Sequence, residues 1–177
     1  MTRTSAVILA TAALAALADT VTPASGAGAA ASTPPCNAKN FAGALIQIQG
    51  AAGSGFGQLI LVNKSKTTCH SSGFIGGTFL GPTGNELHTT ITHEAFSSPV
   101  NCKATKPCAV VPGSALRADL HWSHIPVGSQ QTCEKTRALR VKLPGTEGTT
   151  RVNFPDIACN GDLIVRRLRN PTPATND

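Results

Sequence analysis

The sequence predicts an all-β fold built as a sandwich of two sheets. Apolar and polar residues alternate in short runs, which is the period of a strand with one buried face. The chain holds 17 Gly and 12 Pro in 177 residues, and many of them separate these runs as turn signals. No helical periodicity follows residue 35. These observations exclude a coiled coil, a helical bundle, a collagen and a polar disordered chain, and they leave a closed β-barrel as the alternative architecture.

The alternating runs predict about nine strands, in keeping with a two-sheet sandwich of 7–9 strands. They cover residues 44–49, 58–63, 74–80, 86–92, 109–111, 116–122, 139–143, 149–154 and 163–168. The clearest run is 116–122, in which every second side chain is apolar and Trp122 is the last, so we expect Trp122 in the core. The Gly-rich segment 50–57 is expected to be a flexible hairpin connection, because a strand rather than a helix follows it.

The N-terminus has the pattern of a secretory signal peptide. Arg3 precedes an uncharged apolar stretch that ends in Ala16-Leu17-Ala18, a small-x-small cleavage site, and a second such site ends at Ala29. The stretch is too short to span a membrane, and no lipid-anchor pattern precedes Cys36. We therefore expect a signal peptide at 1–18, a flexible lead-in at 19–35, one domain at 36–169 and a disordered tail at 170–177.

Six cysteines behind a signal peptide indicate disulfides rather than metal ligands, since no CxxC pair occurs. They are Cys36, Cys69, Cys102, Cys108, Cys133 and Cys159. Cys102 and Cys108 are close enough in sequence to close a loop, and Pro107 favours the turn. The other four leave three pairings open. With all six paired, no thiolate remains for catalysis.

The order of motifs resembles an actinobacterial secreted domain family that is known only as a domain of unknown function, number 4232. The shared features are Cys36, the Gly-rich segment 50–57, a strand at 59–63, Cys69 before Gly73-Phe74, a strand from Pro112-Gly113 to Trp122, Cys133, a strand closing at Pro144, and Cys159-Asn160-Gly161. Ile75 stands where the family usually has Pro, and the loop between Cys102 and Cys108 is an addition. The resemblance implies an immunoglobulin-like sandwich with bridges Cys36–Cys69 and Cys133–Cys159, and no activity.

A basic sheet face is the strongest functional signal in the sequence, whose formal net charge is +6. Arg140 and Lys142 share the outward face of one predicted strand, because Leu139, Val141 and Leu143 should face inward. The candidate residues of this face are Arg137, Arg140, Lys142, Arg151, Arg166, Arg167 and Arg169. Neighbouring strands would have to bring them together. Nucleic acid is not expected as the partner, since no aromatic residues are interleaved for base stacking.

The basic face gives the first alternative function, an electrostatic binder of anionic envelope polymers. Histidines give the second alternative, an extracellular metal-binding protein or hydrolase. His121 and His124 are the weak metal candidates, because both could bind one ion only if the strand ends between them. His88 and His93 are five residues apart and should point to opposite faces. We predict no metal, no cofactor and no catalytic residue. The expected function is that of a secreted, non-catalytic binding or structural module. Its ligand is unknown, belongs to the cell envelope or the extracellular space, and could be anionic. We expect neither a lipid anchor nor a membrane span.

Overall fold

The computed structural model describes residues 33–95, 101–128 and 132–170, which all belong to one compact unit. The predicted signal peptide and nearly all of the lead-in and tail lie outside the described residues. The strands are β1 (Phe41–Ala51), β2 (Ser54–Asn63), β3 (Cys69–Ser71), β4 (Gly76–Leu80), β5 (Thr90–Glu94), β6 (Cys108–Val110), β7 (Ala115–Ser123), β8 (Cys133–Lys135), β9 (Ala138–Lys142), β10 (Thr149–Asn153), β11 (Ile157–Cys159) and β12 (Asp162–Arg166). A short 3-10 helix, η1 (Ala38–Asn40), precedes β1.

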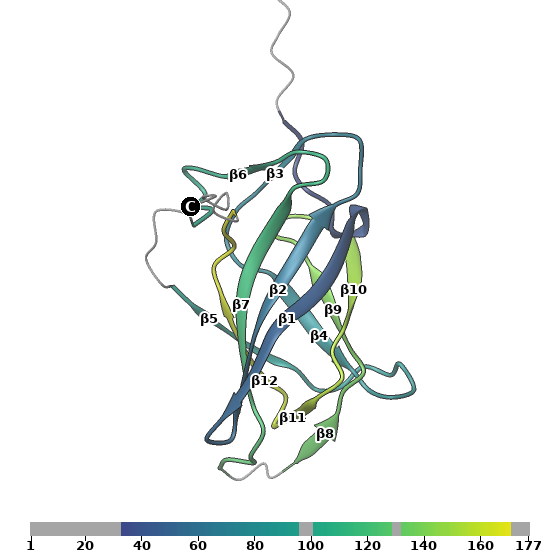
Figure 1. Cartoon of the computed structure of the whole chain (residues 1–177), viewed down its shortest axis with the longest axis vertical. Helices are drawn as coiled ribbons and strands as arrows, with labels where there is room; N and C mark the ends of the chain where they lie inside the picture. The colour runs from purple at the N-terminus through teal and green to yellow at the C-terminus, as the bar shows by residue number, and fades with distance from the viewer. Residues whose placement is uncertain (1–32, 96–100, 129–131, 171–177) are drawn as a thin grey trace, which may run out of the picture. The chain divides into compact units, whose positions relative to one another are not determined.

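Two sheets form the layers of a β-sandwich, which confirms the predicted fold class (Figure 1). The large sheet has the strand order β1-β2-β7-β12-β5, and the small sheet has the order β10-β9-β4. All neighbours in these sheets are antiparallel except β12 and β5, which run parallel. The two-stranded pairs β3–β6 and β8–β11 lie at opposite ends of the sandwich (Figure 1).

The described residues contain more strands than the 7–9 expected, because three-residue strands are too short to show an alternation. β3 and β8 each begin with a cysteine and β11 ends with one. These strands are therefore short backbone pairings next to disulfides, and they do not have the alternating apolar face that marks the longer strands. Within the described parts of the chain, no helix has the length and apolar character to cross a membrane.

The core lies between the two sheets and is formed by the apolar positions that the alternation predicts. Buried and partly exposed residues alternate along the whole of β7, so that Trp122 is 1% exposed. Phe154, which follows β10, packs its ring edgewise on Trp122 at 4.7 Å and in a tilted arrangement on Phe79 of β4 at 5.2 Å. Such ring pairs favour edge contacts because the ring edge is positive and the ring face is negative. These three side chains join the large sheet to the small one.

The Gly-rich segment 50–57 forms a hairpin, as the sequence predicts, but the two strands extend through most of it. β1 continues to Ala51 and β2 begins at Ser54, so that only Ala52 and Gly53 form the turn. Both have positive φ, at 47° and 81°, as a type I′ hairpin requires. Gly55 is glycine for a different reason, since a Cβ there would overlap the indole of Trp122.

Candidate functional site

Four of the seven predicted basic residues lie on or beside the outer face of the small sheet. Arg140 and Lys142 point outward from β9 because Leu139 and Val141 face the core. Arg151 of β10 is the direct cross-strand partner of Arg140. Arg137 immediately precedes β9 and is exposed. The structure therefore brings Arg137, Arg140, Lys142 and Arg151 together, and we call these four residues the basic sheet face.

The other three predicted residues are not part of that face, because β12 pairs with β7 and β5 in the large sheet. Arg166 forms an ion pair with Glu94 at 3.4 Å, and Arg169 forms one with Asp119 at 2.6 Å. The guanidinium of Arg167 lies 4.8 Å from the ring centre of Phe74. The sequence alone could not show this, since it does not fix which sheet the C-terminal strand joins.

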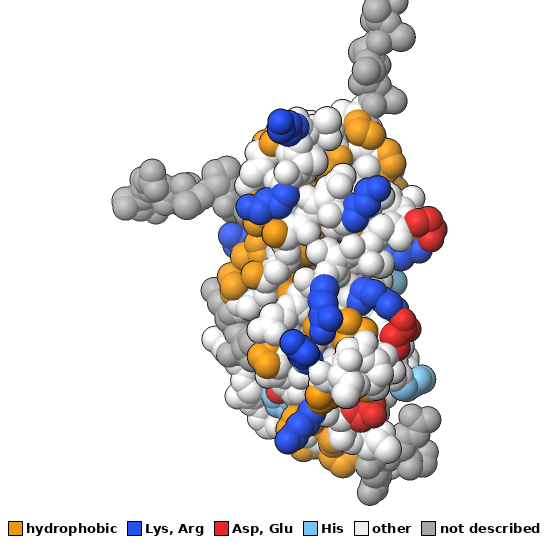
Figure 2. Space-filling view, turned by 90° about the vertical axis from the view of Figure 1, so that its right-hand side faces the viewer, with side chains coloured by type: hydrophobic (Ala, Val, Ile, Leu, Met, Phe, Trp, Pro, Cys, Tyr) orange, Lys and Arg blue, Asp and Glu red, His pale blue; other side chains and the backbone are white. Residues whose placement is uncertain are grey.

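The basic sheet face carries an excess of positive charge. Its four basic residues meet two carboxylates: Glu86 lies 2.6 Å from Arg140, and Glu147 lies 3.3 Å from Lys142. Four positive charges against two negative ones leave an excess of two. Figure 2 shows Lys and Arg side chains spread along the side of the domain where Figure 1 places β1 and β10, with fewer acidic side chains among them. A surface with this imbalance attracts anions.

The hydrogen bond between Arg140 and Glu86 changes the protonation equilibria of both groups. It lowers the pKa of the Glu86 carboxyl below its usual value of 4.5, and the charge of Arg140 acts in the same direction. The same bond raises the pKa of Arg140. Both charges are therefore present at neutral pH, although the pair is largely exposed and contributes little to stability.

Arg137 and Arg151 have no acidic partner among the described residues. Together with Ala138 and Asn153 they line an open hollow of about 290 Å³ on the outer face of the small sheet. One Nη of Arg137 donates a hydrogen bond to the carbonyl oxygen of Pro82 at 3.4 Å, which links it to the loop after β4. The remaining guanidinium N–H groups of the two arginines are available to an external acceptor.

The outer face of the large sheet has a second hollow, of about 250 Å³, but its charges are already balanced. Phe56 stacks on His121 at 4.4 Å along one side of it. On the other side, Asp119 accepts hydrogen bonds from Arg169 at 2.6 Å and from Gln58 at 3.1 Å. The charged residues of this face are Arg117, Arg166 and Arg169 against Glu94, Asp119 and Asp162, a sum of zero. This hollow therefore offers an aromatic and amide-lined surface with no net attraction for ions.

The histidines do not converge on one point. His121 lies on the outer face of β7 against Phe56, and His93 stacks on Phe74 at 4.5 Å. His88 contacts the hydroxyl of Thr90 at 3.2 Å. In the described residues no three His, Cys, Asp or Glu side chains are grouped as metal ligands would be. A metal site shared by His121 and His124 would need the strand to end between them, and β7 does end at Ser123. The two side chains nevertheless have different neighbours, since His121 stacks on Phe56 and His124 contacts Trp122.

His124 takes part instead in a cluster with Trp122 and Asp156 that the sequence did not indicate. The indole Nε1–H of Trp122 donates to Nε2 of His124 at 2.9 Å and to Oδ2 of Asp156 at 3.0 Å. Nε2 of His124 lies 3.1 Å from both carboxylate oxygens of Asp156. A buried indole N–H needs an acceptor, and this cluster supplies two.

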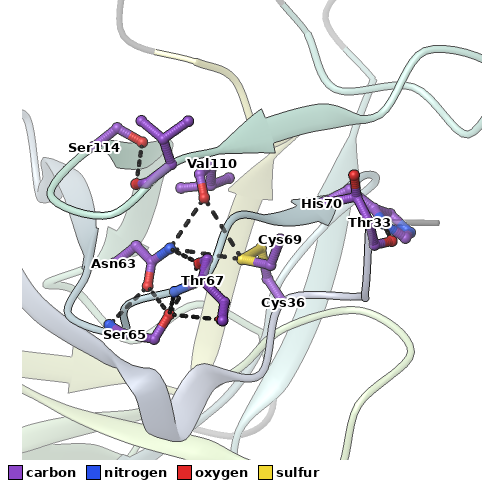
Figure 3. The surroundings of a disulfide bond; sticks show 10 residues. Thr33, Cys36, Asn63, Ser65, Thr67, Cys69, His70, Val110 and Ser114 are labelled. Carbon is purple, nitrogen blue, oxygen red and sulfur yellow. Dashed lines mark hydrogen bonds between the residues drawn. A yellow bond between two sulfur atoms is a disulfide. The ribbon is translucent and has the colours of Figure 1, made fainter. Parts of the chain in front are cut away.

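The disulfides are Cys36–Cys69, Cys102–Cys108 and Cys133–Cys159, which are the expected pairs. Cys133 and Cys159 are direct cross-strand partners in β8 and β11. Figure 3 shows the first bridge beside the buried amide of Asn63. Nδ2 of Asn63 donates to the carbonyl oxygens of Thr67 and Val110, both at 3.0 Å, and this amide therefore fastens the loop after β2 to β6.

Residues 36–169 match the family model of a domain of unknown function, DUF4232. The chain belongs to this family. No curated protein and no solved structure gives a significant match. The DUF4232 match begins at Cys36 and ends at Arg169, so that it includes all three disulfides and every strand from β1 to β12.

Proposed function

We propose that this DUF4232 chain is a secreted, non-catalytic binding module that attaches to anionic polymers of the cell envelope or its surroundings through the basic sheet face. The observation that carries the proposal is the placement of Arg140 directly opposite Arg151 across two strands. Like charges in this position destabilise a sheet, and because Glu86 compensates Arg140, a bound polyanion would balance the remaining charge of Arg151.

Secretion is supported by the signal-peptide pattern and by three disulfides, which persist in oxidising compartments. The non-catalytic role is supported by the disulfides, which use all six cysteines, and by the separation of the histidines. A binding role fits a rigid sheet face that holds several charged groups at fixed spacing.

The test is binding of the oxidised protein to immobilised polyglutamate and polyphosphate across a salt series. A variant with Arg137, Arg140, Lys142 and Arg151 replaced by Ser should bind both polymers much more weakly, with a shallower dependence on salt. The matched control replaces four exposed lysines, Lys64, Lys66, Lys103 and Lys106, by Ser and loses the same charge elsewhere. Equal weakening in both variants, or binding that does not fall with salt, would refute a specific role for the basic sheet face.

A further inference from the structure

We infer that the basic sheet face contains a discrete oxyanion site, formed by Arg137, Arg151 and Asn153, that takes one phosphoryl group of the bound polymer. The inference rests on the proposed function and names the chemical group that the basic sheet face recognises. It is carried by the juxtaposition, around a single hollow, of one amide and two guanidinium groups that have no carboxylate partner within the described part of the chain.

The backbone fixes the positions of these three residues. Arg151 and Asn153 are two apart on β10, so both point to the outer face of the small sheet. The backbone N–H of Phe154 donates to the carbonyl oxygen of Arg137 at 2.9 Å, which places Arg137 beside the end of β10. The cross-strand partner of Asn153 is Ala138, whose small side chain leaves the space between the two arginines open.

The charge distribution around the hollow favours an anion over a neutral ligand. Of the two arginines that face each other across β9 and β10, Arg140 is compensated by Glu86, and Arg151 has no such partner among the described residues. The guanidinium of Arg137, on the other side of the hollow, donates to the uncharged carbonyl of Pro82. Two positive charges thus lie beside the hollow, and a ligand with negative charge would balance them.

The number and arrangement of donors favour a phosphoryl group over a carboxylate. A carboxylate has two oxygens in one plane, and a single guanidinium fork satisfies both of them. A phosphoryl group presents oxygens in several directions, so it can accept from two guanidinium groups and from the Asn153 amide at once. We therefore expect phosphate-bearing polymers to bind better than carboxylate-bearing polymers of equal charge.

The surroundings of the hollow favour a soluble polymer over a membrane surface. Insertion into the interface of a lipid bilayer requires apolar side chains that enter the acyl region beside the charges. The exposed large apolar residues of the described chain are Ile46, Phe56, Val111, Ile125, Val127 and Ile157, and none of them lies on the small sheet. A phosphate carried on a chain in solution needs no such residues.

The experiment is an NMR titration of the ¹⁵N-labelled, oxidised protein with inorganic phosphate and, at matched ionic strength, with acetate. We expect saturable shifts of the Asn153 side-chain amide and the Arg137 and Arg151 guanidinium signals with phosphate, and small, non-saturating shifts with acetate. Replacing Arg137 and Arg151 by Ser should weaken phosphate binding at least about tenfold. The control variant with Lys64 and Lys66 replaced by Ser should bind phosphate like the parent protein. Non-saturating or equal shifts with the two anions would overturn the oxyanion site.

Polymer binding separates the failure of this site from the failure of the proposed function. If polyphosphate and polyglutamate bind equally through the basic sheet face, the proposed function stands and the phosphoryl site is wrong. If neither polymer binds, the proposed function is wrong as well. Vesicles of phosphatidylglycerol serve as the third arm, and stronger binding to them than to polyphosphate would contradict the assignment to a soluble polymer.

Discussion

The indole of Trp122 covers the backbone of Gly55 so closely that a Cβ at residue 55 would overlap Nε1 and Cε2 of the ring. The two residues are direct cross-strand partners in β7 and β2. Gly57, two residues further along, also lies under this ring and under Leu45. Because Gly55 and Gly57 of β2 have no side chains, they leave the space that the indole of Trp122, the largest core side chain, occupies.

We predict that Gly55→Ala destabilises the fold by about 1–3 kcal/mol, because the added methyl overpacks the core against Trp122. The matched control is Gly50→Ala. Gly50 is the cross-strand partner of Gly55 on β1, and the nearest neighbours of a Cβ there would be 3.8 Å away. Denaturant unfolding followed by fluorescence should show a lower midpoint for Gly55→Ala only. Equal midpoints for the two variants would mean that the ring moves aside at no cost.

The fold was predictable from the sequence where burial and strand period coincide. Leu116, Ala118, Leu120 and Trp122 are all buried, as their alternation requires. The length of the strands in the Gly-rich segment was not predictable, because a glycine that makes room for a ring looks, in one sequence, like a glycine that makes a loop. The difference depends on which side chain lies across the strand, and that is a long-range contact.

The candidate site was predictable only in part, for a related reason. Arg140 and Lys142 share a face because the strand period fixes it, and Arg151 joins them through a short hairpin. Arg166 lies further along the chain on β12, which joins the other sheet, and Arg169 follows that strand. Residue types and spacing do not fix which sheet a strand joins, so the acidic partners Glu86, Glu94 and Asp119 were also not predictable.

We predict that Asn63→Ala destabilises the fold by roughly 2–3 kcal/mol, because it leaves buried carbonyl groups without donors. Asn63 is 1% exposed, and its Nδ2 is a donor to Thr67 and Val110 while its Oδ1 accepts from Ser65. The control is Asn40→Ala at an exposed position in η1, which should be nearly neutral. Unfolding midpoints give the comparison, and an Asn63→Ala protein as stable as the control would show that water replaces the amide.

The pair Glu86–Arg140 predicts a small pH-dependent contribution to stability. The folded protein holds the pKa of Glu86 below its unfolded value, because Arg140 donates a hydrogen bond to the carboxylate. The contribution is therefore fully present above the unfolded pKa and is lost as the pH falls through the lower, folded pKa. Glu86→Gln should lower the unfolding midpoint slightly at neutral pH and leave it unchanged near pH 2.

The control, Glu147→Gln, removes a carboxylate that is 97% exposed beside Lys142, and it should change the midpoint less. A Glu86→Gln effect of equal size at both pH values would contradict an electrostatic origin, as would one that 1 M salt leaves unchanged.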